Sequence, residues 1–362
     1  MKNLIKSFVL FLLILIAQIA YGQTDEEKAL EKGLKAIELM DNGKIDESIK
    51  LLEEAQKLDP DKFHYPYELA YAYYLKEDYK FTIKILEKNI HHKDVNDLLF
   101  QLLGNSYDFI GKTKKAFQVY DAGLKKFPNS GKLYLEKGNV YWGKKEYLKA
   151  LPFYEKGIEV DPQFPSNYYR ATLVYCGSSE EVWGMIYGEI FMNLERNSKR
   201  TSEISKLLFD TYKSEIKFTS DSSLSVSFSE NSTIYINDVK NPGRLKLPFG
   251  IGIYEPTLMM SMLNEKSIDI NSLYRIRKNF VETYYKNGND KEYPNILFDY
   301  QNKVLKAGHF ESYNHWILMK GDEVAFDDWH SSNKEKWDDF IKWFSENGLY
   351  VDSSNMFFTG QY

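Results

Sequence analysis

The sequence is poor in the residues that support several common kinds of protein chemistry. It holds one cysteine, Cys176, among 362 residues, so no disulfide can form within the chain. Only six histidines are present, which limits metal and acid–base sites to a few positions. Acidic residues outnumber basic ones by 52 to 47, for a net charge of -5. Because nucleic-acid binding requires a basic surface, we expect no nucleic-acid partner.

Long apolar runs are also scarce, with one exception at the N-terminus. Two lysines precede the apolar run Phe8–Ala17, and small residues at Ala20 and Gly22 suit a signal peptidase. We therefore expect residues 1–22 to be a cleaved signal peptide and the protein to be exported to the periplasm, the cell surface or the medium. The alternative is an uncleaved anchor, but the run is short for a span of about 20 residues and Gln18 interrupts it. After cleavage we expect no membrane span.

What the chain does have is apolar and aromatic residues. Hydrophobic residues make up 43% of the chain, and it contains 28 Tyr, 23 Phe and 6 Trp. This content is enough for a sizeable core, and at about 150 residues per domain the length suggests two or three domains. We expect Cys176, which falls among apolar residues, to be a buried structural cysteine rather than a reactive thiol.

The first half of the chain is built from an internal repeat. Residues of similar kind recur every 34 positions in five columns, which indicates stacked copies of one structural unit. The columns are Pro60, Asp94, Pro128, Pro162; Ala36, Ala70, Gly104, Gly138, Thr172; Leu39, Tyr73, Tyr107, Tyr141, Tyr175; Ser48, Thr82, Ala116, Ala150; and Leu52, Leu86, Tyr120, Tyr154.

One unit predicts a pair of antiparallel helices. Residues 133–162 have apolar residues at helical spacing, a break near Gly143 and a stop at Pro162. We expect Gly138 to lie where the two helices cross and Tyr154 to fill the space around it. A single hairpin cannot bury its apolar faces, so the units must stack.

This pattern resembles the tetratricopeptide repeat, a helical hairpin that forms solenoids. The fold class predicted is therefore mainly α, with a solenoid of about four to five hairpins followed by a mostly helical domain with a small β-hairpin. The solenoid is expected over residues 29–196 and the C-terminal domain over residues 200–362. The repeats are placed near 29–62, 63–96, 97–130, 131–164 and, in degenerate form, 165–196.

The resemblance implies a concave groove that binds a protein or peptide. The expected groove residues are His64, Tyr67, Tyr71, Tyr74, Gln101, Asn105, Phe109, Lys132, Asn139, Trp142 and Tyr169. Exposed aromatic rings and asparagines suit an extended peptide. The alternative is that these rings pack on a C-terminal helix of the same chain. Basic residues beside the asparagines are too few for the clamp with which some relatives hold a terminal carboxylate, so no such ligand is expected.

The second half loses the 34-residue register. A short helix is predicted over 204–213, and strict alternation over 224–228 and 233–237 predicts a β-hairpin. Helices are predicted over Pro256–Leu263 and Ile270–Lys286 and again beyond Tyr293. The whole chain is similar to exported tetratricopeptide-repeat proteins of Bacteroidetes-type bacteria, a likeness that implies no particular activity.

The best candidates for a catalytic or metal site are Glu311, His315 and His330 in the C-terminal half. Glu311 and His315 are one helical turn apart, and only the tertiary fold could bring His330 to them. The chain has no phosphate loop, nucleophile elbow or HExxH motif, so we expect neither an enzyme nor a cofactor. The alternative function is a metal-dependent or hydrolase-like enzyme with its site in this domain. The cadence of residues 307–318 instead predicts a helix hairpin with His309 exposed in its turn.

Overall fold

The computed structural model describes residues 24–220, 223–231, 247–263 and 265–362. The expected signal peptide and the strand expected over 233–237 lie outside these residues. The chain divides into two compact units, one ending at Phe127 and one beginning at Pro128, and each is described by itself. In the described part of the chain, no helix combines the length and apolarity that a bilayer crossing needs.

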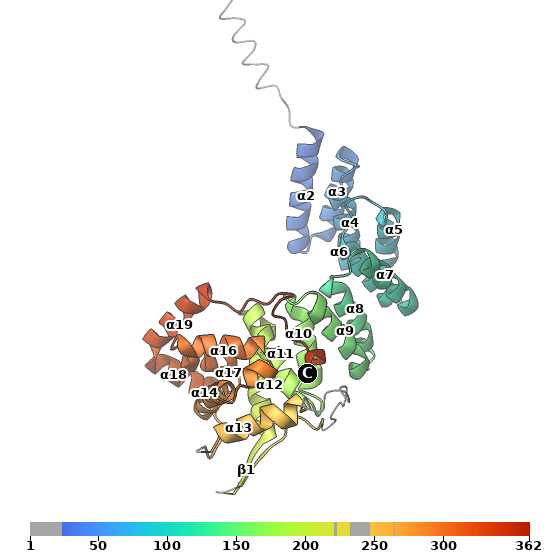
Figure 1. Ribbon diagram of the computed structural model, residues 1–362. Helices are drawn as coiled ribbons and strands as arrows, with labels where there is room; N and C mark the ends of the chain where they lie inside the picture. Colours follow the sequence, from blue (N-terminus) through green and yellow to red (C-terminus); the bar gives the residue numbers. More distant parts are fainter. Residues whose placement is uncertain (1–23, 221–222, 232–246, 264) are drawn as a thin grey trace, which may run out of the picture. The chain divides into compact units, whose positions relative to one another are not determined.

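The first unit consists of helices that pack as consecutive antiparallel hairpins (Figure 1). Each hairpin pairs one helix with the next along the chain. The helices are α2 Asp25–Asp41, α3 Ile45–Leu58, α4 His64–Leu75, α5 Tyr79–Asn89, α6 Asp97–Phe109 and α7 Thr113–Lys126.

The second unit begins with two more hairpins and continues into a mostly helical region (Figure 1). The hairpin helices are α8 Gly131–Gly143, α9 Tyr147–Val160, α10 Pro165–Tyr175 and α11 Glu181–Leu194. After them come α12 Lys199–Glu215, β1 Ile216–Ser220, β2 Ser223–Val226, a π-helical turn η1 Gly250–Tyr254, α13 Glu255–Ser261, α14 Ile270–Lys286, α15 Asn289–Glu292, α16 Ile296–Lys306, α17 Phe310–Leu318, α18 Glu323–Ser332, α19 Lys334–Glu346 and η2 Thr359–Gln361. The predicted fold class, a helical solenoid followed by a mostly helical region with a small hairpin, is confirmed.

Glycines in the small-residue column allow the two helices of a hairpin to approach. A Cβ placed on Gly104 would lie 2.1 Å from the ring of Tyr120, and one on Gly138 would lie 2.3 Å from the ring of Tyr154. Both tyrosines are almost fully buried. The expectation that Gly138 lies at the helix crossing, with Tyr154 around it, is therefore confirmed.

A continuous hydrophobic core runs through the second unit. It includes Tyr154 and Tyr168 of the repeats, Phe191 of α11, and Tyr284 and Phe340 of the C-terminal helices. The last repeats thus share a core with the region that follows them. The loss of the 34-residue register near residue 196 marks a change of sequence pattern but no break in this packing.

The small sheet contains a strand that was not predicted, whereas the predicted pairing with 233–237 falls outside the described residues. The predicted strand at 224–228 is present as β2, and it pairs antiparallel with β1, in the register Phe218 to Leu224. Helix α12 is also longer than the helix predicted over 204–213, and β1 follows it directly. Ile216 and Phe218 alternate with polar residues, but the segment follows α12 without a turn, which conceals the strand in the sequence.

The helices predicted in the C-terminal half are largely confirmed. Helix α14 has the predicted bounds, and α13 covers most of the predicted 256–263 segment. Helices α16 and α17 form the expected hairpin, and Gly308 in its turn adopts φ +81. His309 was expected to face water, but it is half-buried because its ring packs 5.2 Å from Trp343.

Candidate functional site

Three of the expected groove residues of the first unit form an aromatic cluster. Tyr71 stacks on Tyr74 at 6.4 Å between ring centroids, and Phe109 meets Tyr74 edge to face at 5.8 Å. A fourth ring, Tyr79, stacks on Phe109 at 4.9 Å with an interplanar angle of 7°. Phe109 remains 62% exposed. The predicted aromatics of α4 and α6 therefore do come together, and they leave apolar surface open to solvent.

The other expected groove residues of this unit lie outside the aromatic cluster, and most of them are half-buried. The imidazole Nδ1 of exposed His64 lies 3.8 Å from a carboxylate oxygen of Glu68. Tyr67 is half-buried, and burial raises the pKa of its hydroxyl. Gln101 and Asn105 are half-buried on α6.

The two groove asparagines are held by the same contact in two repeats. Tyr120 donates its hydroxyl proton to Oδ1 of Asn105 at 2.5 Å, and Tyr154 donates to Oδ1 of Asn139 at 3.3 Å. Asn139 also donates from Nδ2 to Glu136 at 3.1 Å. Each asparagine carbonyl oxygen thus accepts one hydrogen bond within its own hairpin, which fixes the side chain and uses one of the two lone pairs of the oxygen.

The second unit contains a pocket of about 680 Å³ at the turn end of its hairpins. Trp142 and Tyr147 meet edge to face on one side of it, with ring centroids 4.8 Å apart. The lining residues are Trp142, Tyr147, Leu148, Leu151, Leu173, Val174, Tyr175, Gly177, Ser178, Ser179 and Glu180. This size and mostly apolar lining are typical of sites that bind ligands.

The acidic and the basic side chains beside the pocket differ in how they are paired. The guanidinium of Arg170 lies over the Trp142 ring, 4.6 Å from its centroid. Glu180, by contrast, accepts hydrogen bonds from the Ser229 hydroxyl at 2.8 Å and from the backbone N–H of Asn231 at 2.7 Å. The negative charge at the pocket is therefore already satisfied, whereas the positive charge rests on an aromatic face.

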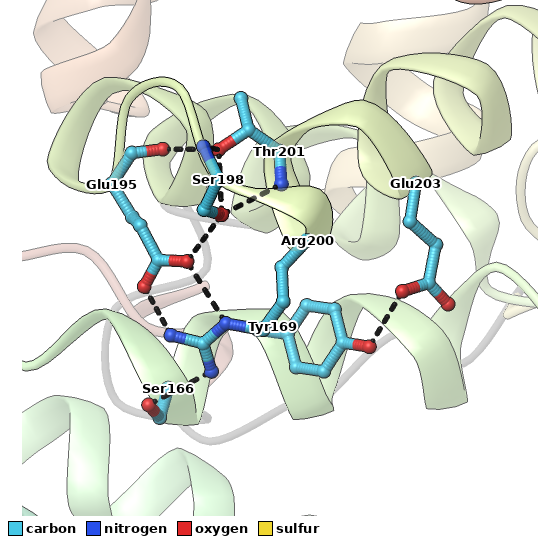
Figure 2. Close-up of polar contacts among 7 residues, drawn as sticks. All are labelled: Ser166, Tyr169, Glu195, Ser198, Arg200, Thr201 and Glu203. Atoms are coloured by element: carbon cyan, nitrogen blue, oxygen red, sulfur yellow. Dashed lines mark hydrogen bonds and ion pairs between the residues drawn. The ribbon is translucent and has the colours of Figure 1, made fainter. Parts of the chain in front are cut away.

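Tyr169 packs against α12 of the same chain (Figure 2). Its hydroxyl donates to Glu203 of α12 at 2.7 Å, and the guanidinium of Arg200 lies 5.0 Å from its ring centroid. Arg200 is held in turn by an ion pair with Glu195 and by a 3.0 Å bond to Ser166. For Tyr169, the alternative of packing on a helix of the same chain is thus observed. Lys132 lies over another ring, Phe164, at 5.8 Å.

Several pocket residues lie outside the first helices of the repeats, where the groove is predicted. Tyr147 and Leu148 begin the second helix, and Leu148 is 73% exposed. Tyr79 stands in the same repeat column as Tyr147, so this column was visible in the sequence. The absence of a side chain at Gly177 also shapes the pocket, and such an absence carries little signal in one sequence.

Glu311 and His315 share contacts around Trp329, whereas His330 packs elsewhere. His315 is fully buried, its ring stacks on Trp329 at 4.0 Å, and its Nδ1 bonds the backbone carbonyl of Glu311 at 2.8 Å. Burial lowers the pKa of His315, which favours a neutral ring. His330 stacks instead on Phe326. Among the described residues, no three His, Cys, Asp or Glu side chains are grouped so as to hold a metal ion.

The Glu311 carboxylate forms hydrogen bonds with side chains of the two helices that follow α17. It accepts hydrogen bonds from the indole of Trp329 at 2.9 Å and from Lys336 at 3.0 Å. Burial alone would raise the pKa of Glu311, but these two donors hold it below its usual value. Its role in the structure is therefore to tie α17 to α18 and α19.

A buried ion pair lies deeper in the second unit. Arg277 donates to Glu189 at 2.5 Å and to Asn314 at 2.8 Å, and Gln301 donates to Glu189 at 2.7 Å. The cavity beside these groups, about 20 Å³, has room for about one water molecule. This network joins α11, α14, α16 and α17 and has no space for a substrate.

Comparison with known proteins identifies the repeats. Two family descriptions, both of the tetratricopeptide repeat, match residues 34–80 and 131–164. A search of curated proteins finds no match.

Solved structures resemble about half of the chain. MamA from Desulfovibrio magneticus RS-1 is 17% identical, with 48% of this chain and 98% of that chain covered and a TM-score of 0.36. A thermophilic TPR protein of Thermus thermophilus is 14% identical, with 50% and 98% covered and a TM-score of 0.42. Pseudomonas aeruginosa pilF is 15% identical, with 52% and 85% covered and a TM-score of 0.43.

Proposed function

Because the chain carries tetratricopeptide repeats, we propose that it is a protein-interaction scaffold of the cell envelope that holds a polypeptide partner in the pocket of its second unit. The observation that carries this proposal is an open, largely apolar hollow at the end of two repeat hairpins, rimmed by Trp142, Tyr147 and the exposed Leu148. Aromatic side chains bury much area at low entropic cost, so they suit the recognition of a polypeptide. The aromatic cluster of the first unit is a second candidate contact surface.

The envelope location is part of the same proposal. It is supported by the sequence of residues 1–22, where two lysines, an apolar run and small residues follow in the order of a signal peptide. The protein would then act outside the cytoplasm without an internal disulfide, since it has one cysteine. Packing of the core described above would have to stabilise it there.

Site-specific photo-crosslinking in the exporting cell tests the proposal. A photoreactive phenylalanine analogue replaces Leu148, which is 73% exposed, and in a matched control it replaces Val324, which is 74% exposed and distant in sequence. We expect a discrete crosslinked polypeptide from position 148 alone, in the envelope or secreted fraction. Trp142→Ala should weaken it about tenfold or more, because a buried aromatic anchor is lost.

Three crosslinking results would contradict the proposal. If position 148 gives no crosslink beyond that of position 324, or if Trp142→Ala leaves the crosslink unchanged, the pocket is not the contact surface. A product found only in the cytoplasm would contradict export.

A further inference from the structure

The pocket of the second unit has a counterpart in the first unit. Trp142 and Tyr147 stand two repeat periods after Tyr74 and Tyr79, in the same columns. Both pairs meet edge to face, Trp142–Tyr147 at 4.8 Å and 61° and Tyr74–Tyr79 at 5.4 Å and 71°. The repeat therefore builds the same aromatic corner twice.

The two corners differ in what lies against them. In the first unit the ring of Phe109 stacks on Tyr79 at 4.9 Å and meets Tyr74 edge to face at 5.8 Å. Two periods later this column holds Gly177, which has no side chain, and α10 ends two residues before it, at Tyr175. The space that Phe109 fills in one unit is thus left open in the other, as the pocket of about 680 Å³.

We infer that the pocket receives a phenylalanine side chain of the partner polypeptide, flanked by acidic residues, in the place that Phe109 occupies in the first unit. This inference rests on the proposed function. The ring would stack on Tyr147 and present its edge or face to Trp142, an arrangement that aromatic groups favour. The remaining volume would hold the backbone on either side of the phenylalanine.

The acidic flanks follow from the charges around the pocket. Arg170 over Trp142, and the exposed Lys144 and Lys145 in the turn that joins α8 to α9, have no carboxylate partner among the described residues. Glu180 is the acid that lines the pocket, and its oxygens already accept hydrogen bonds. A partner with glutamate or aspartate beside its phenylalanine would complement this surface, most strongly at low salt.

Peptide pools test the occupant directly. The immobilised full chain is offered capped heptapeptides whose central residue is Phe, Leu or Ala and whose other positions are drawn equally from Glu, Lys and Ser. Recovered peptides are quantified by mass spectrometry. We expect Phe to be enriched over Ala about 10- to 100-fold, as burial of an aromatic ring implies. Glu should be enriched over Lys at the flanks, and 0.5 M salt should reduce this preference on the order of threefold.

A single substitution fills the pocket from within. A Cβ on Gly177 would meet only ordinary contacts, 3.5 Å from the carbonyl oxygen of Leu173, so Gly177→Phe should fold with an unchanged or higher Tm. We expect it to abolish the Phe enrichment. Gly143→Phe is the matched control, since Gly143 stands in the same column one repeat earlier and does not line the pocket. It should retain the enrichment.

The outcomes separate the two proposals. Equal recovery of Phe and Ala peptides, or full enrichment on folded Gly177→Phe, overturns the inference. If Gly177→Phe removes the crosslink from position 148 while Phe peptides are not enriched, the pocket binds a partner of other chemistry and only the occupant is wrong. If Phe peptides are enriched on the wild type and lost on Gly177→Phe, the occupant is supported.

Discussion

At the scale of single residues, the environment of Cys176 determines its chemistry. This residue caps the C-terminal end of α10, and its sulfur is next to Gly184 of α11, where a Cβ would lie 2.4 Å from it. Burial raises the pKa of the thiol to about 12, against a smaller opposing effect of its hydrogen bond with Thr211. The thiolate is the reactive form, so the folded protein should be almost inert to alkylation near pH 8.

This expectation is easily measured because Cys176 is the only cysteine of the chain. Iodoacetamide at pH 8 should label the folded protein at least about 100-fold more slowly than the urea-unfolded protein. Intact mass followed over time gives both rates. Comparable rates in the two states would show that the thiol is ionised and accessible in the fold, which would reopen the case for a reactive cysteine.

The residues of the predicted metal site show why single positions are hard to assign from sequence. The i, i+4 spacing of Glu311 and His315 is real, since both lie on α17. Their shared contact, however, is made by the backbone carbonyl of Glu311, and its carboxylate turns to Trp329 and Lys336. Spacing fixes which side chains share a helix face, whereas the partners of those side chains come from α18 and α19.

At the scale of the helix hairpin, Gly138 is a position with no room for a side chain. A methyl group there would lie 2.3 Å from the Tyr154 ring. We expect Gly138→Ala to lower the free energy of unfolding by about 1–3 kcal/mol, because an overpacked crossing must spread apart. Gly143→Ala, near the end of the same helix with no atom within 4 Å, should be neutral or stabilising by up to about 1 kcal/mol.

Urea unfolding of the two variants beside the wild type measures the difference. Equal stability of Gly138→Ala and Gly143→Ala would mean that the Tyr154 ring moves aside without cost, and the small-residue column would then have another cause.

Elements of this chain were predictable where their pattern repeats or alternates without interruption. Helix α14 has caps and an apolar face that mark both its ends, and its predicted bounds hold. Strand β1 was missed because it follows α12 without a turn and its apolar alternation is limited to Ile216 and Phe218, so its identity depends on pairing with β2. Local pattern defines an element that packs by one face, but pairing between strands is a tertiary event.

At the scale of the whole second unit, a buried ion pair joins the repeats to the C-terminal helices. Glu189 of α11 meets Arg277 of α14, and both are at least 95% buried. Arg277→Met should cost roughly 3–5 kcal/mol of unfolding free energy, because Glu189 would remain buried without its cation. The double variant Glu189→Leu, Arg277→Met should recover much of that loss.

A double-mutant cycle by urea unfolding decides this point. If Arg277→Met alone costs less than about 1 kcal/mol, the pair contributes little and the hydrophobic core alone joins the two parts of the unit.

The sequence predicted the repeats of this unit but not the way they merge with the region that follows. The 34-residue columns report contacts within and between hairpins, so they define the solenoid. Contacts such as that of Tyr169 with Glu203 or of Glu189 with Arg277 occur once and leave no periodic trace. The same limit explains why Trp142 was predicted at the site and Leu148 was not.

The shared column of Phe109 and Gly177 has an evolutionary consequence. Because the repeats share one hairpin plan, exchange of one residue in this column would open or close a recess while the helix pairs stay in place. Duplication of a repeat would also copy its aromatic corner, and loss of the large side chain in this column would then open a further recess. Arrays of this kind can therefore change their partners by point substitution, and the number of recesses in a descendant chain could be read from the occupants of a single column.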